Sequence, residues 1–314
     1  MKIELLEMLA CPCCRGDLLL NIQTEAMAEI KEGELVCKSC SHKYIISSFI
    51  PRFVESDEYV DTFSFEWNKH RQTQLDSISG TKESELTFQQ KTGFTLGDLK
   101  NKLVLDAGCG AGRFMEVVEK NGGHIVGIDL SFAVDAAFKN MGLRQNVHLI
   151  QADIFKLPFK EEVFDYIFSI GVLHHTPDTK KAFQCLPKFL KKDGEIAIWV
   201  YSNEGFLVRM FNAVSACYRF FTTRMPKRLL YRLSYVSVPL YYPKMIPGIG
   251  HFLGMILPTS THPIREWRIL DTFDWYSPKY QWKHTFKEVM GWFRECGLHD
   301  LRQLTFPIAV RGRK

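Results

Sequence analysis

Three glycines at alternate positions, with an acid just before them, are the residues of this sequence best suited to ligand chemistry. The stretch "LVLDAGCGAGRF" places Gly108, Gly110 and Gly112 after Asp106. A dinucleotide-binding turn expects its third glycine one position later, where this chain has Arg113. Glycine lets the backbone approach a ligand closely. An aspartate favours a cationic amino-acid end over a pyrophosphate, so we expect a nucleoside ligand without a pyrophosphate.

Two further acids end the next two apolar segments. Asp129 follows Asp106 by 23 residues, the separation at which a carboxylate binds both ribose hydroxyls. Asp153 ends the segment "VHLIQAD", where its side chain can accept a hydrogen bond from an adenine amino group. One acid at a strand end is weak evidence, but three around a glycine turn predict an adenosine-containing ligand.

A second set of chemical residues lies near the front of the chain. Cys11 and Cys14 form one CxxC pair, and Cys37 and Cys40 form another. Two such pairs supply the four tetrahedral thiolates of a structural zinc site, and the metal would replace the core that about 54 residues cannot build. Cys13 is the expected non-ligand. The alternatives are reduced cysteines without a metal, or a redox pair, which normally lies in a βαβ unit that this segment lacks.

Two adjacent histidines follow the fourth apolar segment, in "SIGVLHH". His174 or His175 could act as a general base if the group to be modified must first lose a proton. The alternative is a structural role, in which a histidine bonds to the backbone and Asp178 caps the next helix. Both interpretations stay open from the sequence.

The elements that position these residues are predicted by alternation. Within residues 101–202, apolar segments alternate with helical patterns, in the order expected of a parallel sheet covered on both faces. The fold class is therefore α/β, a doubly wound Rossmann-like sheet. Its ligand should lie at the carboxyl ends of the strands, near the point where the strand order reverses.

Four segments flank this core. We expect a zinc ribbon over residues 1–54, a helical connector or lid over 55–100, a helical cap insertion over 203–280, and a closing helix and hairpin over 281–314. In the connector, Trp67, Asn68 and Arg71 are candidates to face the ligand. The alternative is that its aromatic residues only anchor a linker to the core.

The insertion combines basic and apolar residues. From 205 to 265 it carries eight Arg or Lys and no acid. A cap that selects the substrate, peripheral contact with a membrane surface and binding of single-stranded nucleic acid are all compatible with this pattern. Glycine and proline breaks in residues 245–264 argue against a membrane-spanning helix. Aromatic residues in the following segment are expected to wall an acceptor pocket: Trp267, Trp275 and Tyr276.

Composition limits the remaining possibilities. The 314 residues are 46% hydrophobic and carry a net charge of +5, which is no nucleic-acid signature by itself. Nine cysteines without a cleavable signal pattern indicate a reducing compartment. We expect a cytoplasmic protein, and a peripheral position at the inner face of the membrane is the variant that the insertion allows.

The core resembles class I S-adenosylmethionine-dependent methyltransferases of the type 11 group, which includes ubiquinone-biosynthesis methyltransferases. The resemblance rests on "VLDAGCGAGRF", "GIDLS", "QADIFKLPF", "FDYIFSIGVLHHTPD" and "LKKDGEIAIWVY". The front segment, through "LLEMLACPCC", "LVCKSC" and "YIISSFIPRFV", resembles the zinc ribbon that activates tRNA and protein methyltransferases. The segment "WKHTFKEVMGWFRECGL" resembles the last helix before the closing hairpin of such enzymes.

The resemblance implies S-adenosylmethionine and structural Zn²⁺ as cofactors. It also implies a set of residues at the methyl donor: Asp106, Gly108, Cys109, Gly110, Gly112, Asp129, Leu130, Asp153, Ile154 and Ile170. The function implied is methyl transfer to a small-molecule or lipid-linked acceptor. The alternatives are an RNA methyltransferase that uses the ribbon to contact RNA and, in another class, a scaffold that binds the donor without turnover. The sequence indicates neither the methylated atom nor the oligomeric state.

Overall fold

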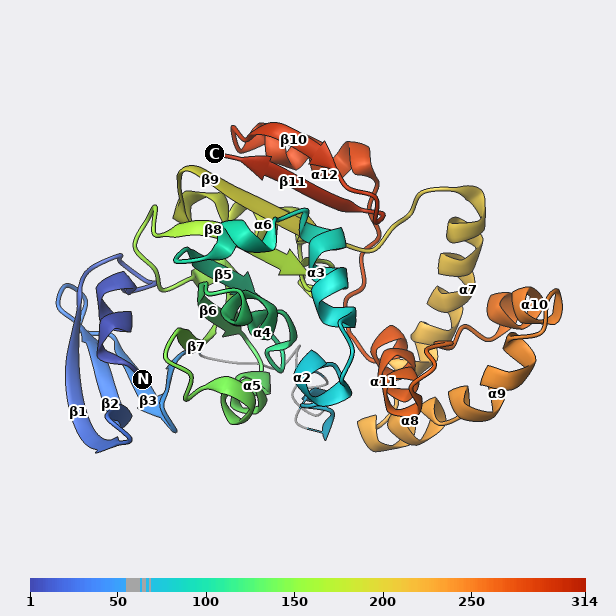
Figure 1. The fold of residues 1–314 in the computed structure, drawn as a ribbon, viewed down its shortest axis with the longest axis horizontal. Coiled ribbons are helices and arrows are strands. Elements are labelled where there is room, and N and C mark those ends of the chain that lie inside the picture. Colours follow the sequence, from blue (N-terminus) through green and yellow to red (C-terminus); the bar gives the residue numbers. More distant parts are fainter. Residues whose placement is uncertain (55–62, 64–65, 68) are drawn as a thin grey trace.

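The computed structural model describes residues 1–54, 63, 66–67 and 69–314. One sheet runs through the molecule, in the order β1-β2-β3-β4-β7-β6-β5-β8-β9-β11-β10. Figure 1 shows the N-terminal ribbon at one end of this sheet, the hairpin of β10 and β11 at the other, and a group of helices, α7 to α11, at the right-hand side of the molecule. The predicted fold class is confirmed.

The central strands are parallel and apolar. They are β5 (Leu103–Ala107), β6 (His124–Asp129), β7 (Val147–Ala152), β8 (Phe164–Ile170) and β9 (Leu190–Trp199). Because β5 pairs with both β6 and β8, the strand order reverses beside β5. The crevice for a ligand in such a sheet lies at the carboxyl ends of β5 and β8.

Helices cover both faces of these strands. On one face lie α3 (Glu83–Thr92), α4 (Arg113–Lys120) and α5 (Ala133–Met141), which bury side chains such as Phe88, Met115 and Val134. On the other lie α6 (Thr179–Gln184) and α12 (Phe286–Glu295), which bury Phe183 and Phe293. The short α2 (Asp76–Ser79) precedes α3 in the connector.

The helix after β8 is short. It ends at Gln184, and β9 already begins at Leu190. Pro187 starts a separate 3₁₀ turn between them, because proline lacks the N–H that would continue the helix. Asp178 does cap α6, accepting from the Lys181 amide at 3.0 Å.

The ribbon continues the central sheet. It consists of β1 (Leu18–Ala26), β2 (Glu29–Cys37), β3 (Lys43–Ser47) and β4 (Ile50–Phe53), and β4 pairs in parallel with β7. Ribbon residues such as Leu35 and Tyr44 belong to the same buried cluster as core residues such as Ile150. The ribbon is therefore packed as part of the main fold.

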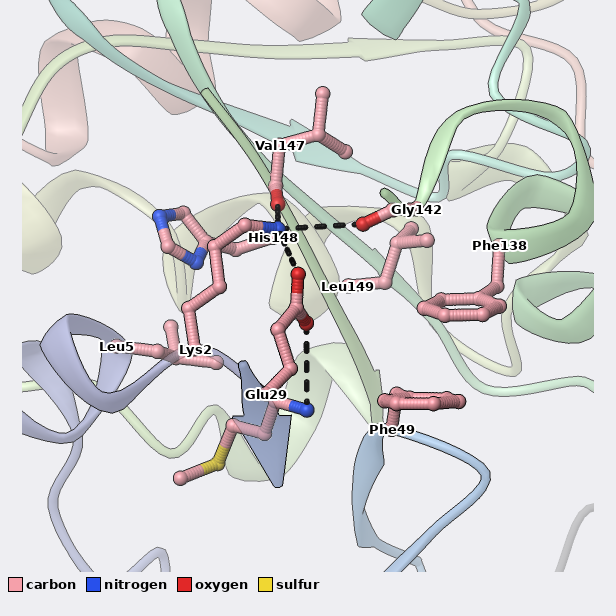
Figure 2. A pocket seen from close by; sticks show the side chains of 10 residues that line it. Lys2, Leu5, Glu29, Phe49, Phe138, Gly142, Val147, His148 and Leu149 are labelled. Carbon is pink, nitrogen blue, oxygen red and sulfur yellow. Dashed lines mark hydrogen bonds and ion pairs between the residues drawn. The ribbon is translucent and has the colours of Figure 1, made fainter. Parts of the chain in front are cut away.

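Polar contacts fix this junction as well. Figure 2 shows Lys2 and Glu29 reaching from the ribbon toward the core. The Lys2 ammonium lies 3.0 Å from the Glu29 carboxylate and donates to the carbonyls of Gly142 and Val147. The Phe49 ring of the ribbon also stacks on the Phe138 ring of α5.

The far edge of the sheet is antiparallel. The hairpin of β10 (His299–Gln303) and β11 (Ala309–Arg313) pairs with β9 through β11. Thr285 and Glu288 form a capping box at the start of α12, so this helix has a well-defined beginning. The predicted closing helix and hairpin are present.

The insertion is a helical cap. It contains α7 (Phe206–Thr222), α8 (Lys227–Ser234), α9 (Ser237–Lys244), α10 (Ile249–Ile256) and α11 (Arg265–Tyr276). Helix α11 packs against α7, α8 and α9, and buries Ile269 and Phe273 among them. In the part of the chain that the structure describes, no helix has the length and apolar content needed to cross a membrane.

Candidate active site

The glycine loop between β5 and α4 has the backbone that only glycine adopts easily. Gly108, Gly110 and Gly112 have φ of 103°, 52° and 90°. A Cβ on Gly108 would overlap the Val172 side chain, so the loop also needs glycine for space. Cys109 is buried within the loop, as a small filler would be.

Two of the predicted acids meet at this loop. One Asp129 oxygen accepts from the Gly110 amide at 3.0 Å, and the other accepts from the amide and hydroxyl of Ser131. Asp106 is 2% exposed, and its Oδ2 atom has no partner in the part of the chain that the structure describes. Burial, reinforced by the nearby Asp129 charge, raises the pKa of Asp106 well above its usual value. A buried carboxyl with an open lone pair fits a cationic ligand group such as an ammonium.

The third acid lies beside a cavity shared with the ribbon. Asp153 caps a 3₁₀ turn, Ile154–Lys156, by accepting from the Phe155 amide. A cavity of about 470 Å³ is lined by Asp153 and Leu130 from the core and by ribbon residues that include Tyr44 and Phe53. Leu130, Asp153 and Ile154 thus follow β6 and β7 at one edge of the sheet, and the ribbon forms the opposite wall.

The four predicted zinc ligands come together. The sulfur atoms of Cys11, Cys14, Cys37 and Cys40 all lie within 4.8 Å of one another. Neighbouring sulfurs are 3.3 Å apart for one pair and 3.7 Å for another, near the ~3.8 Å that a tetrahedron with 2.3 Å zinc–sulfur bonds requires. The thiolate set fits a structural zinc. Cys13 is exposed, and the Tyr44 hydroxyl donates to its sulfur.

The connector lies against the glycine loop. A Cβ on Gly110 would come 3.2 Å from the Trp67 indole, so the ring packs directly on the loop. Arg71 donates to the Asn140 side chain, which in turn donates to the carbonyls of Arg71 and Ala111. Both candidates therefore lie at the loop, while Asn68 falls outside the described residues.

The two histidines occupy different environments after β8. His174 is fully buried, its two ring nitrogens have no partner among the described residues, and its ring centroid lies 3.9 Å from that of Tyr201. The His175 Nδ1 atom bonds to the Tyr280 carbonyl at 2.8 Å, while its Nε2 has no partner within the same residues. Burial lowers the pKa of His175 to about 3 and that of His174 well below 6.5, so both rings are neutral at physiological pH. Ile170 ends β8 just before them.

Carboxyl groups that were not singled out from the sequence gather beside Tyr201. They are Glu66 from the connector and Asp271 and Asp274 from α11. Glu66 is 1% exposed, and residues 1–54, 63, 66–67 and 69–314 provide no partner for either of its oxygens. Burial, followed by repulsion from Asp274 and Asp271, raises the pKa of Glu66 well above its usual value. Burial likewise raises the pKa of Asp274 to about 7, against the effect of a Tyr201 hydrogen bond, and that of Asp271 to about 6.

Cations surround these acids. The Lys91 ammonium lies 3.3 Å above the Trp199 ring, and burial lowers its pKa to about 7. Arg219 donates from α7 to the carbonyls of Trp275 and Pro278. Buried groups of both signs with perturbed pKa values are typical of functional sites.

The aromatic residues that were predicted to wall the acceptor pocket make contacts within the protein. Trp267 is buried between His262, on which it stacks, and Arg113. The Tyr276 hydroxyl donates to the Pro258 carbonyl, and the Trp275 carbonyl accepts from Arg219. Sequence reasoning chose the aromatic residues of α11 and passed over the acids between them, although "DTFDWY" places two acids one helical turn apart.

Family comparisons agree with this geometry. Residues 105–198 match the family model described as a methyltransferase domain, and residues 2–47 match that described as Trm112p-like protein. The chain carries a methyltransferase domain behind a Trm112p-like domain. Both predicted resemblances are thus confirmed, and with them the cofactors of these domains, S-adenosylmethionine and structural zinc.

Relatives differ in what their names say they modify. A tRNA U34 carboxymethyltransferase of Nautilia profundicola is 33% identical over 111 residues, 34% of this chain and 37% of the relative. A ubiquinone biosynthesis O-methyltransferase of Coxiella burnetii is 31% identical over 124 residues, 39% of this chain and 53% of the relative. The chain thus spans about half or less of the length of these relatives.

A solved complex that contains the Trm112 methyltransferase activator of Haloferax volcanii is also similar. Its TM-score is 0.43 at 14% sequence identity, over 80% of this chain and 96% of that one.

Proposed function

We propose that this protein transfers the methyl group of S-adenosylmethionine to a hydroxyl or amine of a small-molecule or lipid-linked acceptor. The observation that carries the proposal is a set of buried polar atoms at the carboxyl edge of the sheet that have no partner among the described residues: those of Glu66, Asp106, His174, His175 and Ser277. Native structures satisfy almost all buried polar atoms. Five of the seven described residues with such atoms lie in this region, the exceptions being His148 and Arg313, and this supports a site for polar ligands here.

The donor half of this site is formed by the glycine loop. Asp106 would accept from the amino-acid ammonium of the donor, while Asp129, freed from the Gly110 amide, would accept from the ribose hydroxyls. Asp153 and Ile154 would lie at the adenine, beside the ribbon. The bound donor supplies an activated methyl group on a positively charged sulfur.

The acceptor half lies between the histidines and α11. The Tyr201 ring packs on His174 and its hydroxyl pairs with Asp274, so Tyr201 lies between the histidine and the acid. We assign His174 to accept a hydrogen bond from the nucleophile, because its ring is neutral and unpartnered. Alignment of the nucleophile with the methyl group is the larger contribution, since orientation can lower a barrier by about 7–11 kcal/mol.

A labelling experiment tests the function. Protein is incubated with donor carrying a labelled methyl group and with separate lipid, small-molecule and RNA fractions. Label is expected in the lipid or small-molecule fraction. Label found in RNA alone would overturn the acceptor class, and donor binding without transfer to any fraction would support a non-catalytic scaffold.

The substitution His174→Phe tests the acceptor half. The phenyl ring keeps the stacking on Tyr201 and removes two unpartnered nitrogens, so we expect a stability gain of about 1–3 kcal/mol and a loss of transfer by about 100-fold. The matched variant His175→Phe loses the bond to the Tyr280 carbonyl and should be destabilised instead. Unchanged turnover in His174→Phe would remove this residue from the mechanism.

RNA is the second candidate acceptor, favoured by relatives named as tRNA carboxymethyltransferases. Against it, three of the ribbon's basic residues are engaged by the protein. Arg15 donates to the carbonyls of Leu157 and Phe159, Arg52 pairs with Asp135, and Lys43 pairs with Glu34. Phosphate binding would need free cations, so we rank RNA below a small or lipid-linked acceptor. We also propose a cytoplasmic location for the protein.

A further inference from the structure

Helix α7 has its polar side toward the protein. Three polar residues on one side of this helix bond to backbone carbonyls of neighbouring segments. Asn212 donates to Ser202 at 3.0 Å, Arg219 donates to Pro278 at 2.6 Å, and Thr222 donates to Tyr276 at 3.0 Å. On the same side, Ser215 is the one residue of α7 that is buried. A surface helix of a water-soluble protein normally buries its apolar side instead.

The opposite side of α7 is apolar and exposed. The residues that lie on it follow the spacing i, i+4, i+7, i+11, i+14 and i+15, which is one stripe of an α-helix. Phe206 at its start is 76% exposed, and Phe220 and Phe221 near its end are 59% and 64% exposed. The stripe comprises Phe206, Met210, Ala213, Cys217, Phe220 and Phe221.

Helix α10 extends this apolar surface. It contacts α7, and the Tyr218 hydroxyl donates to the Ile256 carbonyl to hold the two together. Phe252 is 60% exposed, and Ile249 and Met255 are also exposed. Figure 1 shows α7, α9 and α10 at the end of the molecule farthest from the ribbon. Monomeric soluble proteins seldom expose so many large apolar side chains together.

Positive charge accompanies the apolar residues. Arg209, Arg224, Arg228 and Arg232 are exposed on α7, on α8 and between them, and residues 205–265 contain no acid. A second copy of this chain would bring cations against cations, which disfavours association. An anionic lipid surface offers both the apolar layer and the opposite charge.

We propose that α7 and α10 form a docking surface for anionic membranes, with the apolar stripe in the interface and the arginines at the lipid headgroups. Helix α7 would lie in the plane of the membrane surface. The surface does not overlap the methyl-donor residues, so docking requires no catalytic turnover. It also gives a reason for the outward apolar side of α7.

Vesicle flotation tests the proposal on the full chain. Vesicles of phosphatidylcholine alone are compared with vesicles of phosphatidylcholine and phosphatidylglycerol in equal parts. We expect binding to the anionic vesicles only, weakened by salt. The double variant Phe220→Ser/Phe221→Ser should bind at least tenfold more weakly, and Arg228→Glu/Arg232→Glu should lose the preference for anionic lipid.

Matched variants separate these effects from general ones. Met27→Ser/Leu143→Ser removes exposed apolar side chains elsewhere, and Lys31→Glu/Lys38→Glu makes the same change of net charge on the ribbon. Both should bind like the unmodified protein, and circular dichroism should confirm that all variants fold. Equal binding to both vesicle types overturns the proposal. So does the absence of vesicle binding together with a dimer that Phe220→Ser/Phe221→Ser dissociates.

Because the assay contains no methyl donor, its failure would leave the proposed methyl transfer untouched. If the protein does not bind vesicles but labels a water-soluble acceptor, the docking proposal fails and the proposed methyl transfer holds.

Discussion

Single residues of the site carry polar groups that the free protein leaves unsatisfied. Asp106 is the clearest, because its carboxyl is buried near Asp129 and one of its oxygens has no partner among the residues that the structure describes. A buried, unpartnered group lowers the stability of the free protein and becomes useful only when a ligand pairs with it. Stability and ligand affinity should therefore respond to its substitution in opposite directions.

The substitution Asp106→Asn tests this opposition. The neutral amide has no ionisation to suppress, so the melting temperature of the free protein at pH 8 should rise. A charge-assisted hydrogen bond to the donor is lost, so its dissociation constant should increase about 10- to 100-fold. Differential scanning calorimetry and titration calorimetry measure the two quantities. A fall in stability together with unchanged affinity would contradict the role given to Asp106.

Asp274 gives a pH dependence whose sign is fixed by its environment. Its pKa is about 7 in the folded chain, raised by burial and by Asp271, against a usual value of 3.8. Between these values the folded state holds a proton that the unfolded state has released, so this group's contribution to stability falls as pH rises from about 4 to 7. Above pH 7 its contribution no longer changes.

The variant Asp274→Asn should remove that slope. We compare the free energy of unfolding of the variant with that of the unmodified protein. The difference, in favour of the variant, should be larger at pH 8 than at pH 5 by on the order of 2 kcal/mol. Chemical denaturation at both pH values measures the difference. The exposed Glu161→Gln serves as the control and should follow the unmodified protein at both pH values. Parallel curves for Asp274→Asn would mean that Asp274 ionises freely.

Among the elements, the glycine loop has the geometry that least tolerates an added side chain. Gly108→Ala places a methyl group against Val172 at a φ of 103°, where alanine is strained. We expect a loss of about 2–4 kcal/mol of stability and of measurable donor binding. Gly97→Ala is the matched control, because nothing lies within 4 Å of its new Cβ. Equal melting temperatures for the two variants would show that the loop relaxes easily.

The predictability of each element follows from how local its signal is. Strands β5 to β9 are apolar runs, and β5 to β8 end at or just before an acid or a glycine, so the sheet and the positions of Asp106, Asp129 and Asp153 could be predicted from the sequence. Glu66 could not, because a single acid in a polar connector is ordinary until burial makes it unusual. The orientation of α7 could not be predicted either, because an amphipathic pattern does not tell which side of the helix faces the protein.

At the scale of the whole molecule, the pairing of β4 with β7 joins the two matched domains into one sheet. The sequence indicated a ribbon but not its attachment, because pairing between a ribbon edge and a sheet edge leaves no local pattern. The attachment makes the cysteine cluster a neighbour of the proposed methyl-donor site. Asp153 and Leu130 share their cavity with residues of the ribbon, so disturbance of one site should reach the other.

Removal of zinc tests this connection. Without the metal the four thiolates repel, the ribbon loosens, and β4 loses its support beside β7. Because ribbon and core share one buried cluster, we expect a single unfolding transition lowered by roughly 10 °C, with weaker donor binding. Scanning calorimetry after chelation measures this, and added zinc should restore both properties. Cys37→Ser should reproduce the chelated state, whereas Cys13→Ser, at the exposed position between two ligands, should not. The contrary outcome is a ribbon that unfolds in a separate transition, with a core that still binds the donor with unchanged affinity above that temperature. It would show that the two domains are energetically independent despite their common sheet.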